Sequence, residues 1–266
     1  MKKSGKKIGL ALGSGGSRGV AHIGVIKALE EEGIRPDYIA GCSMGSVVGA
    51  AYAKGLTVDE MLDLVTQIKP LSLIDITAIP TSRLSLLRGN KMWNLLLEAI
   101  GNVDFSELKI PFRCIASDLY SGKLVTLSEG DVTQAVRASS SIPSVFPPVK
   151  IDNKLLVDGG VLCRVPVQQV REMGADLVIA VDVLDNTKES VTEVKSIVSM
   201  ITRLFDMIDN QRTQIERSQI NRKNELWIIP PMEGLNQYAI RDFDKAYEDG
   251  YATTRAMMPE IKKFLK

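Results

Sequence analysis

The sequence predicts an α/β protein in which helices flank a mostly parallel central sheet. Short apolar runs alternate with segments of helical spacing along the chain, as in proteins built from strand–helix units. Two of these junctions carry glycine-rich or small-residue turns between an apolar run and a helical segment. At 266 residues the chain is long enough for one large domain of this class, so we expect a single domain over 1–266.

The individual elements follow from this pattern. We expect strands at 7–12, 37–40, 111–117, 123–127, 154–158, 177–183 and 225–229. We expect helices at 18–33, 44–54, 58–68, 90–100, 131–138, 165–173, 190–221 and 242–264. The apolar segment 57–102 is a helical insert that either caps a cleft or packs on the sheet. Residues 190–266 form a C-terminal extension of helices and one strand.

The turn Gly41-Cys42-Ser43-Met44-Gly45 follows the apolar run 38–40 and opens a helix of small residues. It has the G-x-S-x-G pattern and the strand–turn–helix context of a nucleophile elbow. In such an elbow, the flanking glycines permit a sharp turn that exposes the serine hydroxyl. Ser43 is therefore the candidate nucleophile.

The base that would activate this serine is not a histidine of the usual kind. The chain has one histidine, His22, and it precedes Ser43, whereas the α/β-hydrolase triad needs a histidine after the serine. The candidate base is Asp158, which ends an apolar run and precedes two glycines. A buried carboxylate within hydrogen-bond reach can act as a general base. On a parallel sheet, Asp158 and Ser43 would meet outside the carboxyl ends of their strands.

A glycine-rich turn at 13–19, Gly-Ser-Gly-Gly-Ser-Arg-Gly, lies between the first strand and the first helix. Unpaired N–H groups in such a turn can hold a phosphate or the oxyanion of an acyl-transfer intermediate. The phosphate patterns fit poorly, because a Walker A Lys-Ser/Thr pair is absent and Arg18 stands where G-x-G-x-x-G requires glycine. We expect an oxyanion hole formed by the amides of Gly15, Gly16, Ser17 and Met44.

These three motifs together resemble the patatin-like phospholipase family, including its bacterial and neuropathy-target-esterase-like members. The resemblance runs from about residue 8 to residue 182. One departure is Ser14, which stands in the first place of the three consecutive glycines often found in the family's loop. The resemblance implies a three-layer α/β/α fold and a Ser43–Asp158 dyad. By the same resemblance, the activity is hydrolysis of acyl esters, typically of phospholipids or lysophospholipids.

Composition and charge limit the partners and the cellular compartment that we expect for the protein. A net charge of +1 gives no electrostatic field for nucleic acid, and no apolar run reaches the length of a signal-peptide core or a membrane span. The three cysteines Cys42, Cys114 and Cys163 lie in apolar segments, which predicts buried thiols in a reducing compartment. We therefore expect a cytoplasmic protein, with peripheral membrane contact left open. No cysteine pair has zinc spacing and no carboxylates cluster with histidine, so no metal or cofactor is expected.

Several residues keep more than one interpretation. Arg18 binds substrate phosphate, steadies the glycine loop or lies on the surface. The apolar stripe of helix 190–221 is interpreted first as core packing, with a membrane-surface or homodimer contact as the alternative. His22 is expected to pack, and no role is assigned to Asp182 or to Ser139, Ser140 and Ser141.

Two other functions remain open from the residues alone. One is a nucleotide-binding oxidoreductase that uses the turn at 13–19 as a phosphate nest, which predicts nicotinamide binding and indifference to loss of Ser43. The other is a catalytically weak scaffold or regulator that recognises an acyl group or a protein partner, which predicts normal folding without covalent labelling of the serine.

Overall fold

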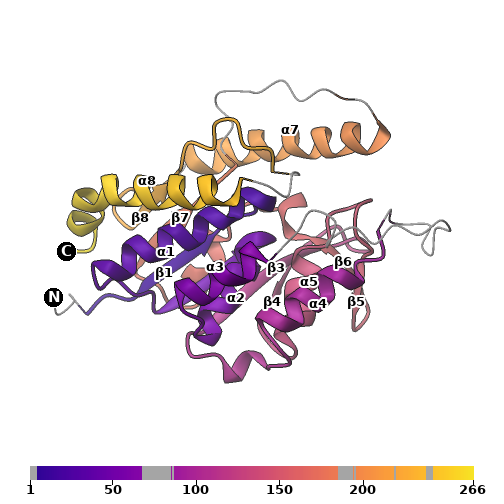
Figure 1. Ribbon diagram of the computed structural model, residues 1–266, viewed down its shortest axis with the longest axis horizontal. Coiled ribbons are helices and arrows are strands. Elements are labelled where there is room, and N and C mark those ends of the chain that lie inside the picture. Colours follow the sequence, from indigo (N-terminus) through magenta and orange to yellow (C-terminus); the bar gives the residue numbers. More distant parts are fainter. Residues whose placement is uncertain are drawn as a thin grey trace.

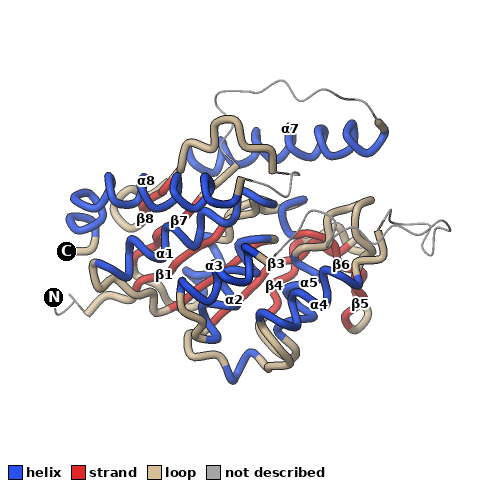
Figure 2. The backbone as a smooth tube through the Cα atoms, in the orientation of Figure 1, coloured by secondary structure: helices blue, strands red, loops and turns tan. Residues whose placement is uncertain are grey.

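Figure 1 shows the chain as a computed structural model, which describes residues 5–67, 85, 87–184, 194, 196–218, 220–237 and 242–266. Helices cover both faces of a central sheet, which Figure 2 shows as red strands among blue helices. The predicted α/β class is confirmed.

The strands are β1 (Ile8–Leu12), β2 (Tyr38–Cys42), β3 (Phe112–Asp118), β4 (Leu124–Leu127), β5 (Val149–Ile151), β6 (Lys154–Asp158), β7 (Leu177–Val181) and β8 (Glu225–Ile228). The α-helices are α1 (Ala21–Glu31), α2 (Met44–Lys54), α3 (Val58–Thr66), α4 (Asn90–Ala99), α5 (Val132–Ser139), α6 (Val167–Glu172), α7 (Ile197–Ser218) and α8 (Phe243–Phe264). Among the described residues, short 3₁₀ turns are η1 (Gly16–Val20), η3 (Phe105–Glu107) and η4 (Gly159–Val161). The prediction missed β5, because three residues after a Pro-Pro pair carry too little alternation to indicate a strand.

One predicted helix differs from the structure, and two further predicted segments lie partly outside the described residues. The helix expected from residue 18 begins as the tighter turn η1, where Gly16 has a φ of +51° and the Arg18 amide donates to the Gly15 carbonyl at 3.1 Å. Within the predicted insert 57–102, residues 68–84 and 86 lie outside the described residues. The same holds for residues 190–193, 195 and 219 of the predicted helix 190–221.

The sheet combines a parallel centre with antiparallel additions. Strands β3, β2, β1, β7 and β8 pair in parallel in that order, while β4, β5 and β6 pair antiparallel with their neighbours. The carboxyl ends of the five parallel strands therefore lie at one edge of the sheet. That edge is where a parallel α/β sheet places its binding site.

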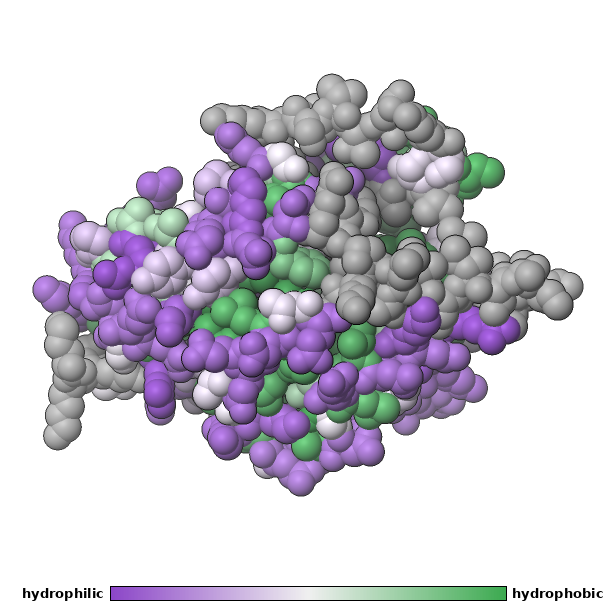
Figure 3. Space-filling model, in the orientation of Figure 1, coloured by the Kyte–Doolittle hydropathy of each residue, from purple (hydrophilic) through white to green (hydrophobic). Residues whose placement is uncertain are grey.

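The core forms two layers on the sheet. The larger hydrophobic cluster packs α1, α2 and α8 against one face, and a smaller cluster under α6 covers the other. Figure 3 shows mainly hydrophilic side chains on the face over α1, α2 and α8, with hydrophobic ones in recesses between the helices. None of the described helices is long and apolar enough to cross a lipid bilayer.

Helix α7 differs from this pattern. Its apolar stripe was predicted to pack in the core, and that prediction is wrong for most of the described side chains, although Ile201 and Phe205 are partly buried. The side chains of Ile197, Leu204 and Ile208 are at least half exposed, with exposed fractions of 73%, 50% and 57%. The buried face of α7 is instead polar and includes Asp209 and Thr213.

Candidate active site

Ser43 lies at the turn between β2 and α2, at the carboxyl edge of the parallel strands. Its φ of 52° and ψ of −123° are unusual for a residue with a side chain, which is the strain expected of a nucleophile elbow. The flanking glycines are required by space: a Cβ at Gly41 would lie 2.4 Å from the Gly45 carbonyl oxygen, and a Cβ at Gly45 would lie 2.3 Å from the Leu12 carbonyl oxygen. The sequence pattern and the observed turn therefore agree.

Two hydrogen bonds hold this turn. The Ser43 amide donates to Ser139 Oγ at 3.0 Å in a buried contact, and Ser46 Oγ donates to the Ser43 carbonyl at 2.6 Å. Ser139 ends α5, 96 positions away along the chain, and the sequence assigned it no role. Its hydroxyl fixes the backbone of the candidate nucleophile from outside the motif.

Replacing Ser139→Ala is expected to leave the Ser43 amide buried without an acceptor. The free energy of unfolding should fall by about 1–3 kcal/mol, and ester turnover by about tenfold as the turn loosens. The matched control is Ser140→Ala, because Ser140 Oγ is buried and makes no hydrogen bond with the described residues. Urea unfolding and steady-state ester hydrolysis measure both effects, and equal behaviour of the two variants would contradict the assignment.

Asp158 reaches the same place by an arrangement that differs from the prediction. Strand β6 runs antiparallel to β3, so Asp158 does not stand at the carboxyl end of a parallel strand. Along β3, residues 112–115 pair with β2 and residues 116–118 pair with β6, while β4 pairs with 114–117. Since a residue has one partner on each side, β2 and β6 share one edge of β3 and approach each other end to end.

This end-to-end arrangement determines where Ser43 and Asp158 lie along the edge of β3. Cys42, the last residue of β2, pairs with Ile115, and Asp158 pairs with the next residue, Ala116. Asp158 therefore lies directly beyond the point where β2 leaves the sheet at Ser43. The Cys42 thiol lies 3.9 Å from Asp158 Oδ1, which places the carboxylate against the elbow.

The surroundings of Asp158 favour a proton acceptor. Its side chain is buried, and burial raises its pKa to about 6, although hydrogen bonds from the Ser43 side chain and the Gly160 amide work in the opposite direction. The Gly160 amide donates to Asp158 Oδ1 at 2.8 Å. A carboxylate with this pKa is ionised at neutral pH and more basic than an exposed aspartate.

The predicted oxyanion donors are not equivalent. Among the described residues, no acceptor is found for the amides of Gly15, Gly16 or Met44, and Gly16 lines the pocket beside Ser43. The Ser17 amide, by contrast, donates to the Gln237 carbonyl at 3.0 Å. Ser17 is therefore occupied in this arrangement, because the segment 235–237 folds over the glycine loop.

The side chains of Arg18 and His22 make hydrogen bonds that hold the glycine loop in place. Arg18 is buried and donates through Nε and Nη2 to the Leu235 carbonyl at 3.0 and 2.5 Å. Arg18 is not among the described side chains that line the pocket beside Ser43, and its hydrogen bonds join the glycine loop to the segment 235–237. Its contact with substrate stays a prediction. His22 Nε2 lies 2.8 Å from the Gly13 carbonyl, and burial lowers the pKa of His22 to about 4. The neutral ring therefore donates to Gly13.

A buried ion cluster connects this region to α7. The Arg164 guanidinium lies 3.3 Å from Asp182 and 2.5 Å from Asp209, and all three are nearly or fully buried. Arg212 of α7 also donates to the Leu162 carbonyl, just after Asp158 in the chain. Asp182, which the sequence left unassigned, thus helps to anchor α7. No sequence pattern indicates a role for Arg164 or Asp209, because their contacts join segments that lie far apart in the chain.

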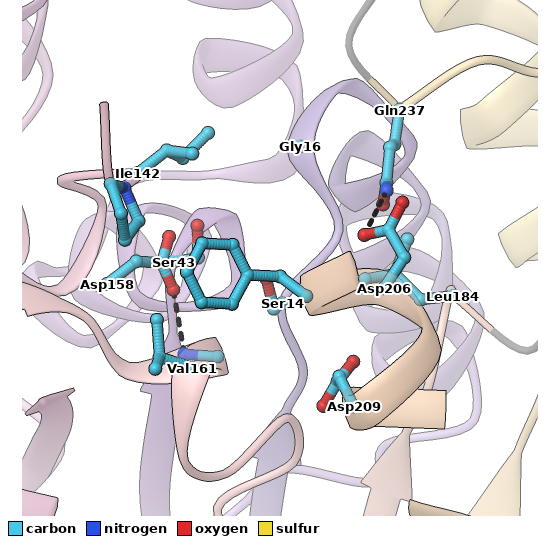
Figure 4. Close-up of a pocket in the computed structure, with 13 residues that line it drawn as sticks. Ser14, Gly16, Ser43, Ile142, Asp158, Val161, Leu184, Asp206, Asp209 and Gln237 are labelled. Atoms are coloured by element: carbon cyan, nitrogen blue, oxygen red, sulfur yellow. Dashed lines mark hydrogen bonds between the residues drawn. The ribbon is translucent and has the colours of Figure 1, made fainter. Parts of the chain in front are cut away.

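Figure 4 shows the pocket in which these elements converge, with Ser43 and Asp158 on one side and Asp206 and Asp209 of α7 on the other. The pocket encloses about 80 Å³. Its wall also includes Ser14, Ile142, Pro143, Gly160, Val161, Leu184, Phe205 and Gln237. Within the described ranges, no group of three or more His, Cys, Asp or Glu residues has the arrangement of a metal site.

Comparison with known proteins gives consistent matches. The family model described as patatin-like phospholipase matches residues 10–171. An uncharacterised NTE family protein of Mycobacterium tuberculosis is 40% identical over 178 residues, covering 67% of this chain and 49% of that protein. A lysophospholipase, nte1, of Aspergillus fumigatus is 30% identical over 285 residues, covering 97% of this chain and 18% of that protein. The chain thus spans about half of the first relative and under a fifth of the second.

Solved structures share the fold at low identity. The crystal structure of VipD from Legionella pneumophila aligns with a TM-score of 0.61 at 13% identity, covering 96% of this chain and 67% of that one. Human GIVD cytosolic phospholipase A2, solved with a methyl γ-linolenyl fluorophosphonate inhibitor and terbium chloride, aligns with a TM-score of 0.51 at 11% identity. That alignment covers 98% of this chain and 59% of the human one. At such identities the likeness concerns the fold alone.

Proposed function

Because this chain belongs to the patatin-like phospholipase family, we propose that it is a serine hydrolase that cleaves acyl esters of phospholipids or lysophospholipids. The observation that carries the proposal is the position of a buried carboxylate, Asp158, at the level of Ser43 where β2 and β6 approach end to end. The name of one relative, a lysophospholipase that is 30% identical over 97% of this chain, supports the substrate class.

The proposed reaction has two steps. Asp158 accepts the hydroxyl proton of Ser43 while Ser43 Oγ bonds to the ester carbonyl carbon. The carbonyl oxygen becomes an oxyanion, held by the amides of Gly16, Gly15 and Met44. When the carbonyl re-forms, the bond to the alcohol breaks and the alcohol leaves with the proton from Asp158. Water then gives a proton to Asp158, attacks the acyl-serine and releases the fatty acid, and Ser43 recovers its proton.

The alternatives fit the geometry less well. A nucleotide-binding oxidoreductase needs a free phosphate nest, whereas the Gly13 and Ser14 amides donate to Val181 and Arg164 carbonyls. A catalytically weak scaffold would not need a strained serine against a buried carboxylate whose pKa is near 6. The predicted cytoplasmic location and homodimer contact stay predictions, as does the absence of a cofactor.

A fluorophosphonate probe tests the proposal directly. The native protein is expected to gain one probe per chain by intact mass, with the label on the peptide that contains Ser43, and to hydrolyse p-nitrophenyl butyrate. Heat-unfolded protein is the control, because an unactivated serine does not react. A folded protein that takes no label and turns over no ester would contradict the proposal. Binding of NADH with no labelling would favour the oxidoreductase.

A further inference from the structure

Ser14 departs from the three consecutive glycines often found in the family's loop, and it lies in the candidate active site. It follows the carboxyl end of β1, and its amide donates to the Arg164 carbonyl at 3.0 Å, which fixes its backbone. Ser14 is partly buried and lines the pocket together with Ser43 and Asp158 (Figure 4). Its hydroxyl makes no hydrogen bond with a described residue. A hydroxyl on a fixed backbone is therefore available at the pocket.

The absence of a side chain at Gly160 lets Ser14 lie close to Asp158. A Cβ added at Gly160 would lie 3.1 Å from Asp158 Oδ1 and 3.3 Å from Ser14 Oγ, so the two oxygen atoms flank the same small space. No direct hydrogen bond joins them, and their separation cannot exceed the sum of these two distances. Two oxygen atoms at such a separation are within reach of one bridging water.

The pocket has room for that water. It encloses about 80 Å³, whereas one bound water needs roughly 10–15 Å³ and at least two polar partners. The polar side chains on the side of the dyad are Ser43, Asp158 and Ser14, while Asp206 and Asp209 belong to α7 on the other side (Figure 4). A water beside Asp158 therefore has Ser14 as its second polar neighbour.

The second step of the proposed reaction needs a water in one orientation. The water gives one proton to Asp158 while its oxygen bonds to the acyl carbon on Ser43. Its other O–H bond needs an acceptor, because a water held only by Asp158 rotates and points its lone pair at the acyl carbon for part of the time. The Gly160 amide and the Cys42 thiol, which also contact Asp158, are donors to it. The Ser14 hydroxyl is an acceptor at the required place.

We propose that Ser14 is a further catalytic residue, whose Oγ accepts a hydrogen bond from the water that hydrolyses the acyl-serine. Asp158 accepts the proton that is transferred, the water oxygen bonds to the acyl carbon, and the bond from that carbon to Ser43 Oγ breaks. The proton then passes from Asp158 to Ser43, and the Ser14 hydroxyl ends the cycle unchanged. The inference rests on the proposed function and assigns a residue to its second step.

This role of Ser14 makes the second step selective for water. Water has two O–H bonds and donates to both Asp158 and Ser14, whereas methanol has one O–H bond, which it gives to Asp158. Loss of the Ser14 hydroxyl should therefore slow hydrolysis and leave transfer of the acyl group to methanol unchanged. A hydrogen bond from Ser14 to the oxyanion would act differently, because an oxyanion forms in both steps and with water and methanol alike.

The test compares the wild type with Ser14→Ala during turnover of p-nitrophenyl butyrate, with and without methanol. Acid quenching and intact mass give the fraction of butyryl-enzyme, and kcat divided by that fraction is the deacylation rate constant. The ratio of methyl butyrate to butyric acid is measured by NMR. Ser14→Ala is expected to lower the deacylation rate constant in water about tenfold and to raise the product ratio about tenfold. The value of kcat/KM, which reports acylation, should stay within about twofold.

Two further variants control for structural effects. Ser14→Thr keeps the hydroxyl, and it should retain the wild-type deacylation rate constant and product ratio within about threefold. Ser117→Ala removes a buried hydroxyl that makes no hydrogen bond with a described residue, on β3 next to the residue that pairs with Asp158. It should behave as the wild type does. Thermal unfolding of each variant checks that the fold is retained.

The results distinguish failure of this assignment from failure of the proposed function. An unchanged product ratio in Ser14→Ala overturns the assignment, as does a ratio that rises only because methanolysis is faster. A fall of kcat/KM equal to the fall of the deacylation rate constant also overturns it, since Ser14 would then act in both steps. In these cases the wild type still turns over the ester, so the proposed function stands. A wild type that takes no fluorophosphonate label and releases no p-nitrophenol overturns the proposed function and the role of Ser14 with it.

Discussion

Ser43→Ala is expected to lower kcat/KM for p-nitrophenyl butyrate by about 10⁴- to 10⁶-fold, because the variant has no nucleophile while the oxyanion donors remain. The fold should be retained. Alanine keeps the Cβ and the positive φ of Ser43, and the contact of its amide with Ser139 does not involve the lost hydroxyl. Initial rates and thermal unfolding measure the two properties separately.

The control for this change is again Ser140→Ala, a buried serine that lies near the site but makes no described hydrogen bond through its hydroxyl. It should keep most of the wild-type rate. A Ser43→Ala protein that retains more than about a tenth of the activity would show that another group attacks the ester. In that case the Ser43→Ala protein should also still take the fluorophosphonate label.

The sequence could predict the nucleophile because its signal is local. Five consecutive residues, Gly41–Gly45, carry the motif. The steric reason for Gly41 lies in the backbone of the same turn, whereas Gly45 is required by the Leu12 carbonyl at the end of β1. The glycine loop was likewise predicted from a local pattern, and the amides of Gly15 and Gly16 have no acceptor among the described residues. What could not be predicted was that the segment 235–237 would occupy the Ser17 amide, because that contact joins residues more than two hundred positions apart.

Asp158 shows a different limit. The residue was predicted, but on the assumption of a parallel strand, whereas β6 is antiparallel and meets β2 end to end. A strand's direction depends on its pairing partners, which hydrophobic periodicity does not encode. Similarly, the stripe on α7 was visible in the sequence, but its orientation was not. The polar face of α7 is held by Arg164, 45 positions before Asp209, and that pairing turns the stripe outward.

Asp158→Asn is expected to lower kcat by about 10³- to 10⁴-fold, because the amide cannot accept the proton of Ser43. The wild type should also show an acidic limb in its pH–rate profile. Since the pKa of Asp158 is about 6, its rate should fall about tenfold per pH unit below that value as the base becomes protonated. The residual rate of Asp158→Asn should lack this limb.

The same substitution is expected to stabilise the folded protein at high pH. The pKa of Asp158 is raised from 3.8 when unfolded to about 6 when folded, so ionisation favours the unfolded chain as the pH rises from about 4 to above 6. Asp158→Asn removes that effect, and its gain in unfolding free energy should be small at pH 4 and reach about 3 kcal/mol at pH 8. Asp209, whose pKa burial also raises to about 6, is present in both proteins, and its charge is one of the causes that raise the pKa of Asp158.

Urea unfolding at pH 4 and pH 8 measures this gain, with Asp152→Asn as the control because Asp152 is exposed in the β5–β6 turn. If Asp152→Asn gained the same unfolding free energy, the effect would come from the change in net charge. If Asp158→Asn were less stable than the wild type at pH 8, the carboxylate would be stabilised by its surroundings, and burial could not be what makes it a base. A loss of activity together with a gain of stability at pH 8 is what distinguishes a buried carboxylate kept for catalysis from one kept for folding.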